Sequence, residues 1–245
     1  MKYATDMTLT DAQKTNVAGI VFWTTADSNT SGKTPAKLTD DKIMATDFPN
    51  CTHGLIVSLN DVSQGTKWQE TYTNIASWQN SEAFNPENKN DYNSIASSKD
   101  DTDPINYILG YQNTKLLKVY NNQCADNNEV LPVSLLDSFS TDNPAPANTT
   151  GWFFPSLKEL TLLCGVDSDG VYSDTFGTST KEAMNSILTS LGTGNANTLA
   201  DANYWSSSEY ADFEFDAFIV DFNLALVHYN VKGYNADYVR AVCAY

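Results

Sequence analysis

The chain has 245 residues, of which 30 are acidic and 14 are lysine or arginine, so its formal net charge is −16. This balance argues against a nucleic-acid-binding protein and against docking on anionic lipid, because both need clustered basic side chains. Hydrophobic residues make up 41% of the chain, which is ample for the core of one large domain, but no apolar run reaches the roughly 18 residues of a membrane-spanning helix.

The first sixty residues predict a tail followed by short buried strands. Residues 1–15 are polar, and we expect them to form a tail outside a single domain of residues 16–245. No apolar signal-peptide segment follows Met1, which fits either a cytosolic protein or the mature part of an exported one. The apolar runs at residues 17–23 and 53–59 predict two buried strands.

The next sixty residues predict two helices separated by a long loop. Residues 68–78 fit a short helix, and the stretch 79–103, rich in Asn, Asp, Ser and Lys, predicts a surface excursion. A helix should then start at Pro104, since proline is favoured at the first helical position, and its apolar stripe continues to Tyr120. Gly110 lies inside this helix and should cost about 1 kcal/mol relative to Ala.

Helix start and stop signals are clearest between residues 150 and 195. A short aromatic strand is expected at residues 152–154. The Ser-x-x-Glu sequence at residues 156–159 is a capping box that opens a helix at residues 157–164. A second Ser-x-x-Glu sequence, at residues 179–182, opens a helix that Gly192 should end.

Residues 199–245 show the period-2 alternation of β-strands and no helical periodicity. In one predicted strand, Phe218, Val220 and Phe222 share a face that we expect to lie in the core. The opposite face is mixed and includes Ile219, an apolar residue that a plainly solvated face would avoid. Each strand is therefore expected to have one core face and one face of mixed character.

Phe213 and Phe215 precede this strand, in a loop that also holds Asp212, Glu214 and Asp216. Exposed aromatic side chains beside acids are typical of binding surfaces. The alternative interpretation is that both are ordinary core phenylalanines.

Arg240 is the only arginine of the chain and lies in a predicted strand. A buried guanidinium needs a partner. We therefore expect a salt bridge or a clamp on backbone carbonyls in the core rather than a catalytic role.

The four cysteines are widely spaced and form no Cys-x-x-Cys motif. An exported protein could use them in two disulfides, for which Cys164–Cys243 and Cys51–Cys124 are the candidate pairs. Buried free thiols are the alternative.

No complete catalytic or metal-binding motif occurs in the sequence. Residues 32–34 match the end of a phosphate-binding loop whose first glycine is missing, and residues 167–170 match the start of a calcium loop whose later ligands are missing. His53 and His228 lie far apart, so a Cys/His zinc site is not expected. The sequence therefore predicts no enzyme and no cofactor, and calcium lacks a supporting motif.

Three motifs follow one another in the last hundred residues: GWFFPSLKEL at 151–160, YWSSSE at 204–209 and YVRAV at 238–242. Together with HGLIVSLND at 53–61, they resemble C-type-lectin-like proteins of the formylglycine-generating-enzyme type and the related collagen-like-adhesin C-terminal domains. More narrowly, the chain resembles the variable proteins of diversity-generating retroelements in gut bacteria, with residues 205–240 as the variable region.

The resemblance implies an α+β protein with a C-type-lectin-like fold of the formylglycine-generating-enzyme subtype: short antiparallel sheets, two or three helices and long loops. It implies a rigid frame, including Trp152, Trp205 and Arg240, whose last strands display changeable side chains. The oxidase members use a cysteine pair near the C-terminus, where this chain has only Cys243. The ligand-binding residues carried over from the resemblance are Asp212, Phe213, Phe215, Asp216, Ile219, Asp221, Leu226, His228, Asn230, Val231, Tyr234, Asn235 and Ala236.

The main hypothesis is a non-enzymatic adhesion or receptor-recognition domain, on the cell surface or secreted. Its partner would be a protein or glycan on another cell or phage host, with no nucleic acid and no membrane insertion. One alternative is an oxidase-like enzyme that uses a cleft of the same fold. The other is a structural pilus or surface subunit, in which a neighbouring chain would cover the aromatic side chains.

Overall fold

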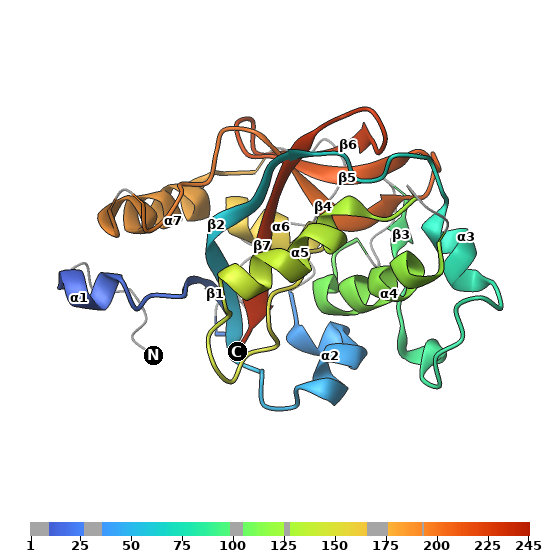
Figure 1. Cartoon of the computed structure of the whole chain (residues 1–245), viewed down its shortest axis with the longest axis horizontal. Coiled ribbons are helices and arrows are strands. Elements are labelled where there is room, and N and C mark those ends of the chain that lie inside the picture. The colour runs from blue at the N-terminus through green and yellow to red at the C-terminus, as the bar shows by residue number, and fades with distance from the viewer. Residues whose placement is uncertain (1–9, 27–35, 99–104, 125–127, 166–175, 193) are drawn as a thin grey trace.

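The computed structural model describes residues 10–26, 36–98, 105–124, 128–165, 176–192 and 194–245. These residues form a mixed sheet with helices on both faces (Figure 1). The strands are β1 (Gly19–Thr24), β2 (Gly54–Thr66), β3 (Ala96–Ser97), β4 (Asn203–Tyr210), β5 (Asp216–Asp221), β6 (Leu226–Val231) and β7 (Asp237–Ala244). The helices are α1 (Asp11–Lys14), α2 (Lys42–Asp47), α3 (Ile75–Asn80), α4 (Gly110–Gln123), α5 (Leu131–Asp142), α6 (Leu157–Cys164) and α7 (Ser179–Ser190), with 3-10 turns at Leu38–Asp40 and Lys89–Asp91.

The sheet joins the beginning of the chain to its end. Its strand order is β1-β2-β7-β4-β5-β6, and β3 pairs with β4 outside this path. The long β2 pairs antiparallel with β7, so that Leu55 lies opposite Ala244 and Asp61 opposite Arg240. Only the contacts of β4 with β7 and β3 are parallel among the described pairs.

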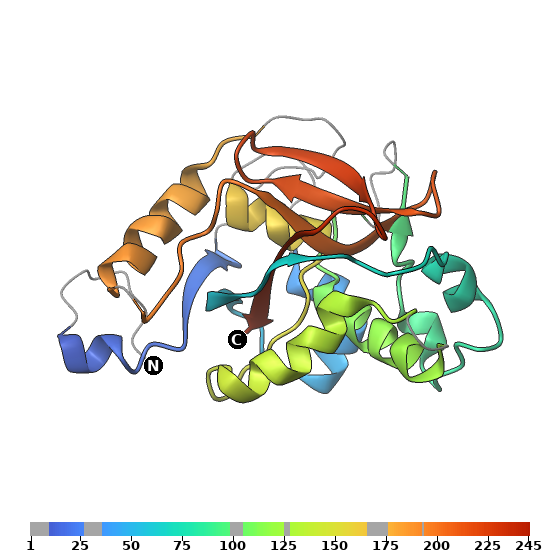
Figure 2. The ribbon, with the colours of Figure 1, turned by 45° about the horizontal axis from the view of Figure 1, so that its top comes forward.

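Helices cover both faces of this sheet (Figure 2). Phe218 and Val220 of β5 pack in the core cluster that contains α6 and α7, which confirms the predicted core face. Ile219, on the opposite face of β5, packs in a second cluster with residues of α4. The mixed face that the sequence predicted for β5 is therefore part of a second core, whereas the corresponding residues of β6, Leu226, His228 and Asn230, are half-buried.

Of the two Ser-x-x-Glu sequences predicted to start helices as capping boxes, only the first forms one in the structure. The capping box at residues 156–159 is present with both of its hydrogen bonds and opens α6 as predicted. At α7, Ser179 is the first helical residue rather than the cap; Thr178 precedes it and donates its hydroxyl to Glu182 at 2.6 Å. Gly192 follows α7 with a φ of +91°, a conformation that glycine adopts without strain.

The predicted helix at residues 68–78 is wrong except at its end, where α3 begins at Ile75. Tertiary hydrogen bonds replace the helical ones: the backbone N–H of Trp68 donates to the carbonyl of Lys232 at 3.0 Å, and the Trp68 indole donates to the carbonyl of Ser206 at 2.9 Å. Apolar spacing alone could not show that these residues bridge to the C-terminal strands.

Other predicted boundaries also move. The helix expected from Pro104 begins at Gly110 in the structure, and Pro104 lies outside the described residues. Residues 11–14 of the predicted tail form the short α1, whereas residues 1–9 lie outside the described part. The sequence analysis missed α5 altogether.

The two candidate disulfides are absent, because none of the four cysteines forms a disulfide bond. The members of each pair pack in different core clusters: Cys51 and Cys164 in the first, Cys124 against the second and Cys243 in the third. Burial raises the pKa of the Cys164 and Cys243 thiols to about 12, which keeps them neutral and unreactive. The alternative of buried thiols holds for Cys51, Cys164 and Cys243, whereas Cys124 is half-buried.

Candidate functional site

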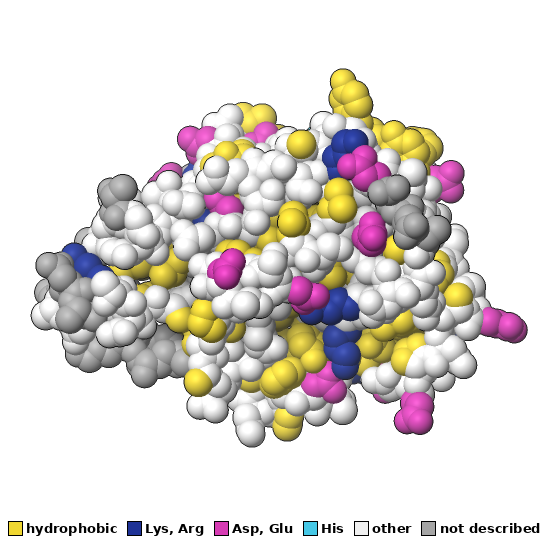
Figure 3. Space-filling view, in the orientation of Figure 1, with side chains coloured by type: hydrophobic (Ala, Val, Ile, Leu, Met, Phe, Trp, Pro, Cys, Tyr) yellow, Lys and Arg dark blue, Asp and Glu magenta, His cyan; other side chains and the backbone are white. Residues whose placement is uncertain are grey.

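Four exposed aromatic side chains lie at one end of the sheet, on the segments that precede α3 and that join β4 to β5 and β6 to β7. Tyr72 is 54% exposed, Phe213 47%, Phe215 41% and Tyr234 81%. The ring of Phe215 lies 5.9 Å from that of Tyr72 and 6.0 Å from that of Phe213, measured between centroids. Hydrophobic side chains protrude at the upper right of Figure 3, where these loops lie in Figure 1. We call these four residues the aromatic patch.

The patch continues into the protein through rings that are progressively more buried. The Phe213 ring lies 5.8 Å from that of Tyr210, and Tyr210 stacks on Tyr229 at 4.4 Å. Tyr210 also packs against the core residue Phe218 at 5.2 Å. Aromatic pairs of this kind contribute roughly 0.5–1.5 kcal/mol beyond their buried area, so the β4–β5 loop is held against the sheet.

A buried ion pair lies beneath the patch. The side chains of Lys232 and Glu209 are 0% and 3% exposed, and the Lys232 Nζ contacts the Glu209 Oε1 directly. The Lys232 ammonium also lies 5.0 Å from the centre of the Trp68 ring. Buried charges are tolerated only when further hydrogen bonds offset the loss of hydration.

Those further bonds tie the loops of the patch together. The Lys232 Nζ donates to the carbonyls of Thr73 at 3.0 Å and Glu214 at 2.8 Å. The Glu209 carboxylate accepts the backbone N–H groups of the first two residues of α3 at 2.9 and 2.8 Å. The ion pair therefore fixes the segment before α3, the β4–β5 loop and the end of β6 relative to one another.

A glycine allows two of these loops to approach closely. A Cβ atom at Gly233 would lie 2.8 Å from the carbonyl oxygen of Glu70 and 3.2 Å from the Cε1 of Tyr72. The turn that carries Tyr234 thus touches the segment that carries Tyr72, and a larger residue at position 233 would separate them.

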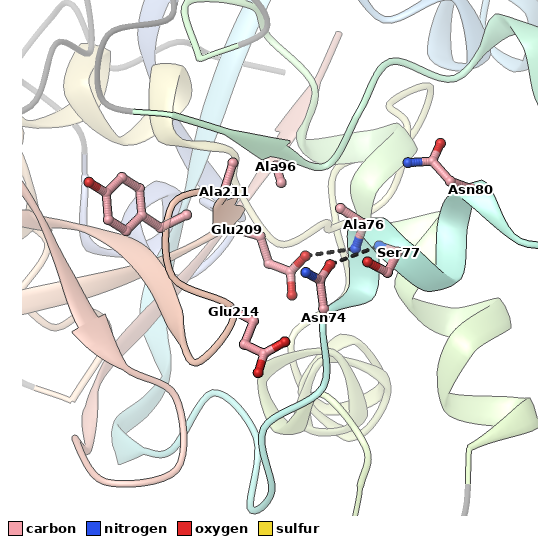
Figure 4. A pocket seen from close by; sticks show the side chains of 9 residues that line it. Asn74, Ala76, Ser77, Asn80, Ala96, Glu209, Ala211 and Glu214 are labelled. Atoms are coloured by element: carbon pink, nitrogen blue, oxygen red, sulfur yellow. Dashed lines mark hydrogen bonds between the residues drawn. The ribbon is translucent and has the colours of Figure 1, made fainter.

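A cavity of about 130 Å³ opens beside the patch (Figure 4). Its walls include Tyr210 and Glu214 of the β4–β5 loop, together with Asn74, Ser77 and Asn80 at α3. Figure 4 shows the Glu209 carboxylate directed at the start of α3, to which it is hydrogen-bonded. The cavity is small and polar, and a carboxylate, amides and a hydroxyl surround it.

The structure brings part of the predicted ligand-binding set to this surface. Asp212, Phe213, Phe215 and Tyr234 are exposed there, and Ala236 is exposed in the β6–β7 turn. These residues are arranged as the binding hypothesis requires, with aromatic rings and an acid open to solvent.

Two members of the set are buried. Ile219 is only 2% exposed and belongs to the second core cluster, so its assignment to the binding face is wrong. Asp216 is 4% exposed, and burial raises the pKa of its carboxyl group. One Asp216 carboxylate oxygen has no hydrogen-bond partner.

Several of the half-buried members hold the turns of the β5–β6–β7 region. The Asp221 Oδ1 accepts two backbone N–H groups of the β5–β6 turn at 2.8 and 2.9 Å, and Leu226 is the strand partner of Asp221 across this turn. Asn230 donates to Asp237 at 2.7 Å. These side chains have structural partners of their own, which reduces their freedom to bind a ligand.

The β6–β7 turn and the preceding strand use three more of the predicted residues. The Asn235 Oδ1 accepts the backbone N–H of Val231 at 3.2 Å. The Nδ1 of His228 lies 2.8 Å from the carbonyl oxygen of Tyr229. His228, Val231 and Asn235 are each half-buried.

The predicted structural residues lie in the core, as expected. Trp152 and Trp205 are buried. Arg240 is 0% exposed; it pairs with Asp61 at 2.9 Å and donates to the carbonyls of Ser58, Leu59 and Asn197 at 3.0, 2.7 and 2.9 Å. The guanidinium thus forms both the salt bridge and the carbonyl clamp that the sequence analysis proposed.

Sequence reasoning missed Tyr72, Glu209 and Lys232. Tyr72 was hidden by the predicted helix at residues 68–78. A signal did exist for the ion pair: Glu209 ends the YWSSSE motif, and Lys232 is a single cation that follows an alternating strand.

The described residues contain no group of three or more His, Cys, Asp or Glu side chains that could hold a metal ion. The two incomplete loop motifs, at residues 32–34 and 167–170, lie outside the described part of the chain. Among the helices described, none is both long and apolar enough to cross a membrane.

Comparison with known proteins gives two matches, and no family model matches the chain. A protein of Bacteroides ovatus named as a fimbrium tip subunit, Fim1C, is 27% identical over 208 residues, which are 80% of this chain and 35% of that protein. The crystal structure of a fimbrial protein from the same species matches 95% of this chain and 44% of its own, with a TM-score of 0.67 and 24% identity. The structural match shows a shared fold, and the chain spans about a third of the length of the curated relative.

These matches correct the family resemblance drawn from the sequence. The similar proteins are named as fimbrial, and neither is named as a variable protein of a diversity-generating retroelement. Residues 205–240 are therefore no longer assigned as a diversified region, while the C-type-lectin-like fold itself stays a prediction. Because both matches are fimbrial proteins, they agree with the prediction that the chain is not an enzyme.

Proposed function

We propose that this chain is part of a fimbrial tip subunit on the cell surface, and that it contacts an external ligand through the aromatic patch. The observation that carries the proposal is the sequence match to a fimbrium tip subunit over 80% of the chain. The shared fold with a crystallised fimbrial protein supports it independently of the sequence alignment. This places the structural pilus subunit, one of the alternatives from the sequence, ahead of a diversified binding protein.

The geometry of the patch supports a recognition role within such a subunit. Exposed aromatic side chains contribute most of the binding energy of many protein interfaces, particularly when their supports are rigid. Here the supports are rigid because the Lys232–Glu209 pair and its hydrogen bonds join all three loops. A tip subunit needs a surface of this kind that is already ordered before its ligand arrives.

Immunogold electron microscopy tests the location. Antibodies raised against the purified chain are applied to intact cells of the producing organism, with a strain that lacks the gene as the control. We expect gold particles at the free ends of surface fibres. Labelling along the whole fibre would indicate a shaft subunit, and labelling only after lysis would contradict a surface role.

A further inference from the structure

We propose that the aromatic patch binds a basic segment of a partner protein, with a lysine or arginine side chain held on the rings around Phe213. This inference rests on the proposed function, because it names the chemistry of the ligand for the same surface. Three features carry it: a buried carboxylate with one oxygen that accepts no hydrogen bond, acids beside the rings, and the faces of the rings themselves.

The first feature is Asp216. Its carboxylate is 4% exposed and one of its oxygens has no hydrogen-bond partner. Its backbone N–H donates to the carbonyl of Phe213 at 3.0 Å, so it lies directly below the loop of the patch. Side chains two residues apart on a strand share a face, which puts the carboxylate on the side of Phe218, the residue whose ring contacts Tyr210.

A buried carboxylate oxygen without a donor is unfavourable in the free protein. Burial raises the pKa of this carboxyl group and outweighs the attraction that Lys232 and His228 already exert on it. A cation on the rings above would add a further favourable charge. Phe213, Tyr210 and Tyr229 offer suitable ring faces, because the face of an aromatic ring carries negative potential and attracts ammonium and guanidinium groups within about 6 Å.

The second feature is the charge around the patch. Asp212 and Glu214 flank Phe213 in the exposed β4–β5 loop. Lys67, an exposed cation of the nearby β2 end, is paired with Glu70 at 2.6 Å. Lys232 is buried and already paired with Glu209. The patch therefore presents uncompensated negative charge, within a chain whose net charge is −16.

The cavity beside the patch offers a second acidic position. Glu214 lines this cavity of about 130 Å³ together with Asn74 and Ser77 (Figure 4). Glu214 and the rings around Phe213 belong to the same loop, so two basic residues of one extended segment could reach both. We therefore infer a segment with more than one basic residue rather than a single free amine. An acidic ligand would be repelled by the same charges.

Fluorescence anisotropy with three labelled peptides of equal length tests the inference: one alternating Lys and Gly, one alternating Glu and Gly, and one alternating Gln and Gly. We expect the wild-type chain to bind the Lys peptide and not the other two. Asp216→Asn keeps the shape of the side chain and removes its charge, and it should weaken binding about tenfold, as should Phe213→Ala with Phe215→Ala.

Two variants control for diffuse attraction. Asp142→Asn removes one charge at the exposed end of α5, and Leu224→Ala removes an exposed apolar side chain, 57% exposed, from the β5–β6 turn. Both should leave the affinity unchanged. An equal loss in Asp142→Asn and Asp216→Asn would overturn the inference, since only net charge would then matter. Circular dichroism verifies folding, and the two exposed phenylalanines decide the outcome if Asp216→Asn does not fold.

Other outcomes are equally decisive. Binding of the Gln peptide as tight as that of the Lys peptide would overturn the role of charge. Retention on immobilised neutral glycans, with no binding of the Lys peptide, would replace a basic protein segment by a sugar. Gold labelling at fibre tips together with either result would refute this inference and leave the proposed function standing.

Discussion

Lys232 and Glu209 are the residues on which the geometry of the patch depends, because their contact joins three loops at once. Their charges are almost fully removed from water. In such pairs the loss of one partner is costly, since the other charge remains buried without compensation. At this scale, stability and the shape of the recognition surface depend on the same two side chains.

Replacing one partner of this pair should therefore destabilise the protein strongly. We expect Lys232→Met to lower the free energy of unfolding by about 3–5 kcal/mol, as measured by urea denaturation. The matched control is Lys118→Met, which breaks an exposed pair with Asp137 whose side chains are 43% and 68% exposed. That change should cost no more than about 1 kcal/mol. Similar losses in both variants would show that the buried pair has no special role.

Glu159 makes the free energy of unfolding depend on pH, and the sign of this dependence follows from its pKa. Its carboxyl group is fully buried at the start of α6, and burial raises its pKa to about 8. Between pH 4.5, the ordinary pKa of a glutamate carboxyl group, and pH 8 the unfolded chain loses this proton first, so the free energy of unfolding falls as pH rises, by up to about 1.4 kcal/mol per pH unit.

The measurement is urea denaturation at several pH values between 6.5 and 8, above the pKa of about 6 to which burial raises Asp41. The Glu159→Gln variant should show a flatter dependence on pH than the wild type, whatever its stability at a single pH. Parallel curves for the two proteins would assign the dependence to another group.

At the scale of elements, the start of α4 shows how tertiary packing overrides helix propensity. Gly110 is the first residue of α4, whereas the sequence predicted it inside the helix. A Cβ atom there would lie 2.5 Å from the Glu159 Oε2 and 2.8 Å from the Phe153 ring. Propensity treats glycine at this position as a cost, whereas the contact with α6 requires it.

Helix propensity and packing predict opposite signs for the change in stability caused by Gly110→Ala. The propensity of a helix interior would predict that Gly110→Ala stabilises the protein by about 1 kcal/mol, an upper limit at the first position of α4. Overpacking against Glu159 predicts a loss of about 1–3 kcal/mol, and we expect the loss. Gly65→Ala is the control, because a Cβ atom at Gly65 meets nothing within 4 Å. A stabilised Gly110→Ala variant, by urea denaturation, would mean that the helix shifts to accept the methyl group.

How well each element could be predicted depended on whether its signal was local. The alternation in the last strands and the capping box of α6 are local patterns, and both were found. The segment from Trp68 to α3 was mistaken for a helix because its backbone bonds reach residues far away in the chain. Ile219 was assigned to the surface because one strand cannot reveal that helices cover both faces of its sheet.

The residues of the candidate site also differ in whether their sequence signal is local. Phe213 and Phe215 could be identified as candidate exposed aromatics from their acidic neighbours, whereas Tyr234 was named only through the family resemblance. Tyr72 could not, because only the fold brings it beside Phe215. Glu209 and Lys232 each stand out in the sequence, but their contact also depends on the fold. The family resemblance gave a surface-recognition role but the wrong family, which the fimbrial matches correct.

At the scale of the whole molecule, a sheet with helices on both faces holds the aromatic patch toward the solvent. The substitutions Phe213→Ala, Phe215→Ala and Tyr234→Ala, combined in one variant, remove exposed rings without opening a core cavity. Such surface changes usually alter stability by no more than about 0.5 kcal/mol each. The combined variant should therefore lose ligand binding and keep its stability.

The most direct test measures both properties on the same variant. Thermal unfolding by circular dichroism is followed by flow cytometry of the labelled chain on cells to which the producing organism attaches, with Leu224→Ala as the control. We predict that the triple variant unfolds within a few degrees of the wild type, about what small surface changes cause, and no longer binds those cells. Full binding by the triple variant, or a large drop in its unfolding temperature, would contradict the account.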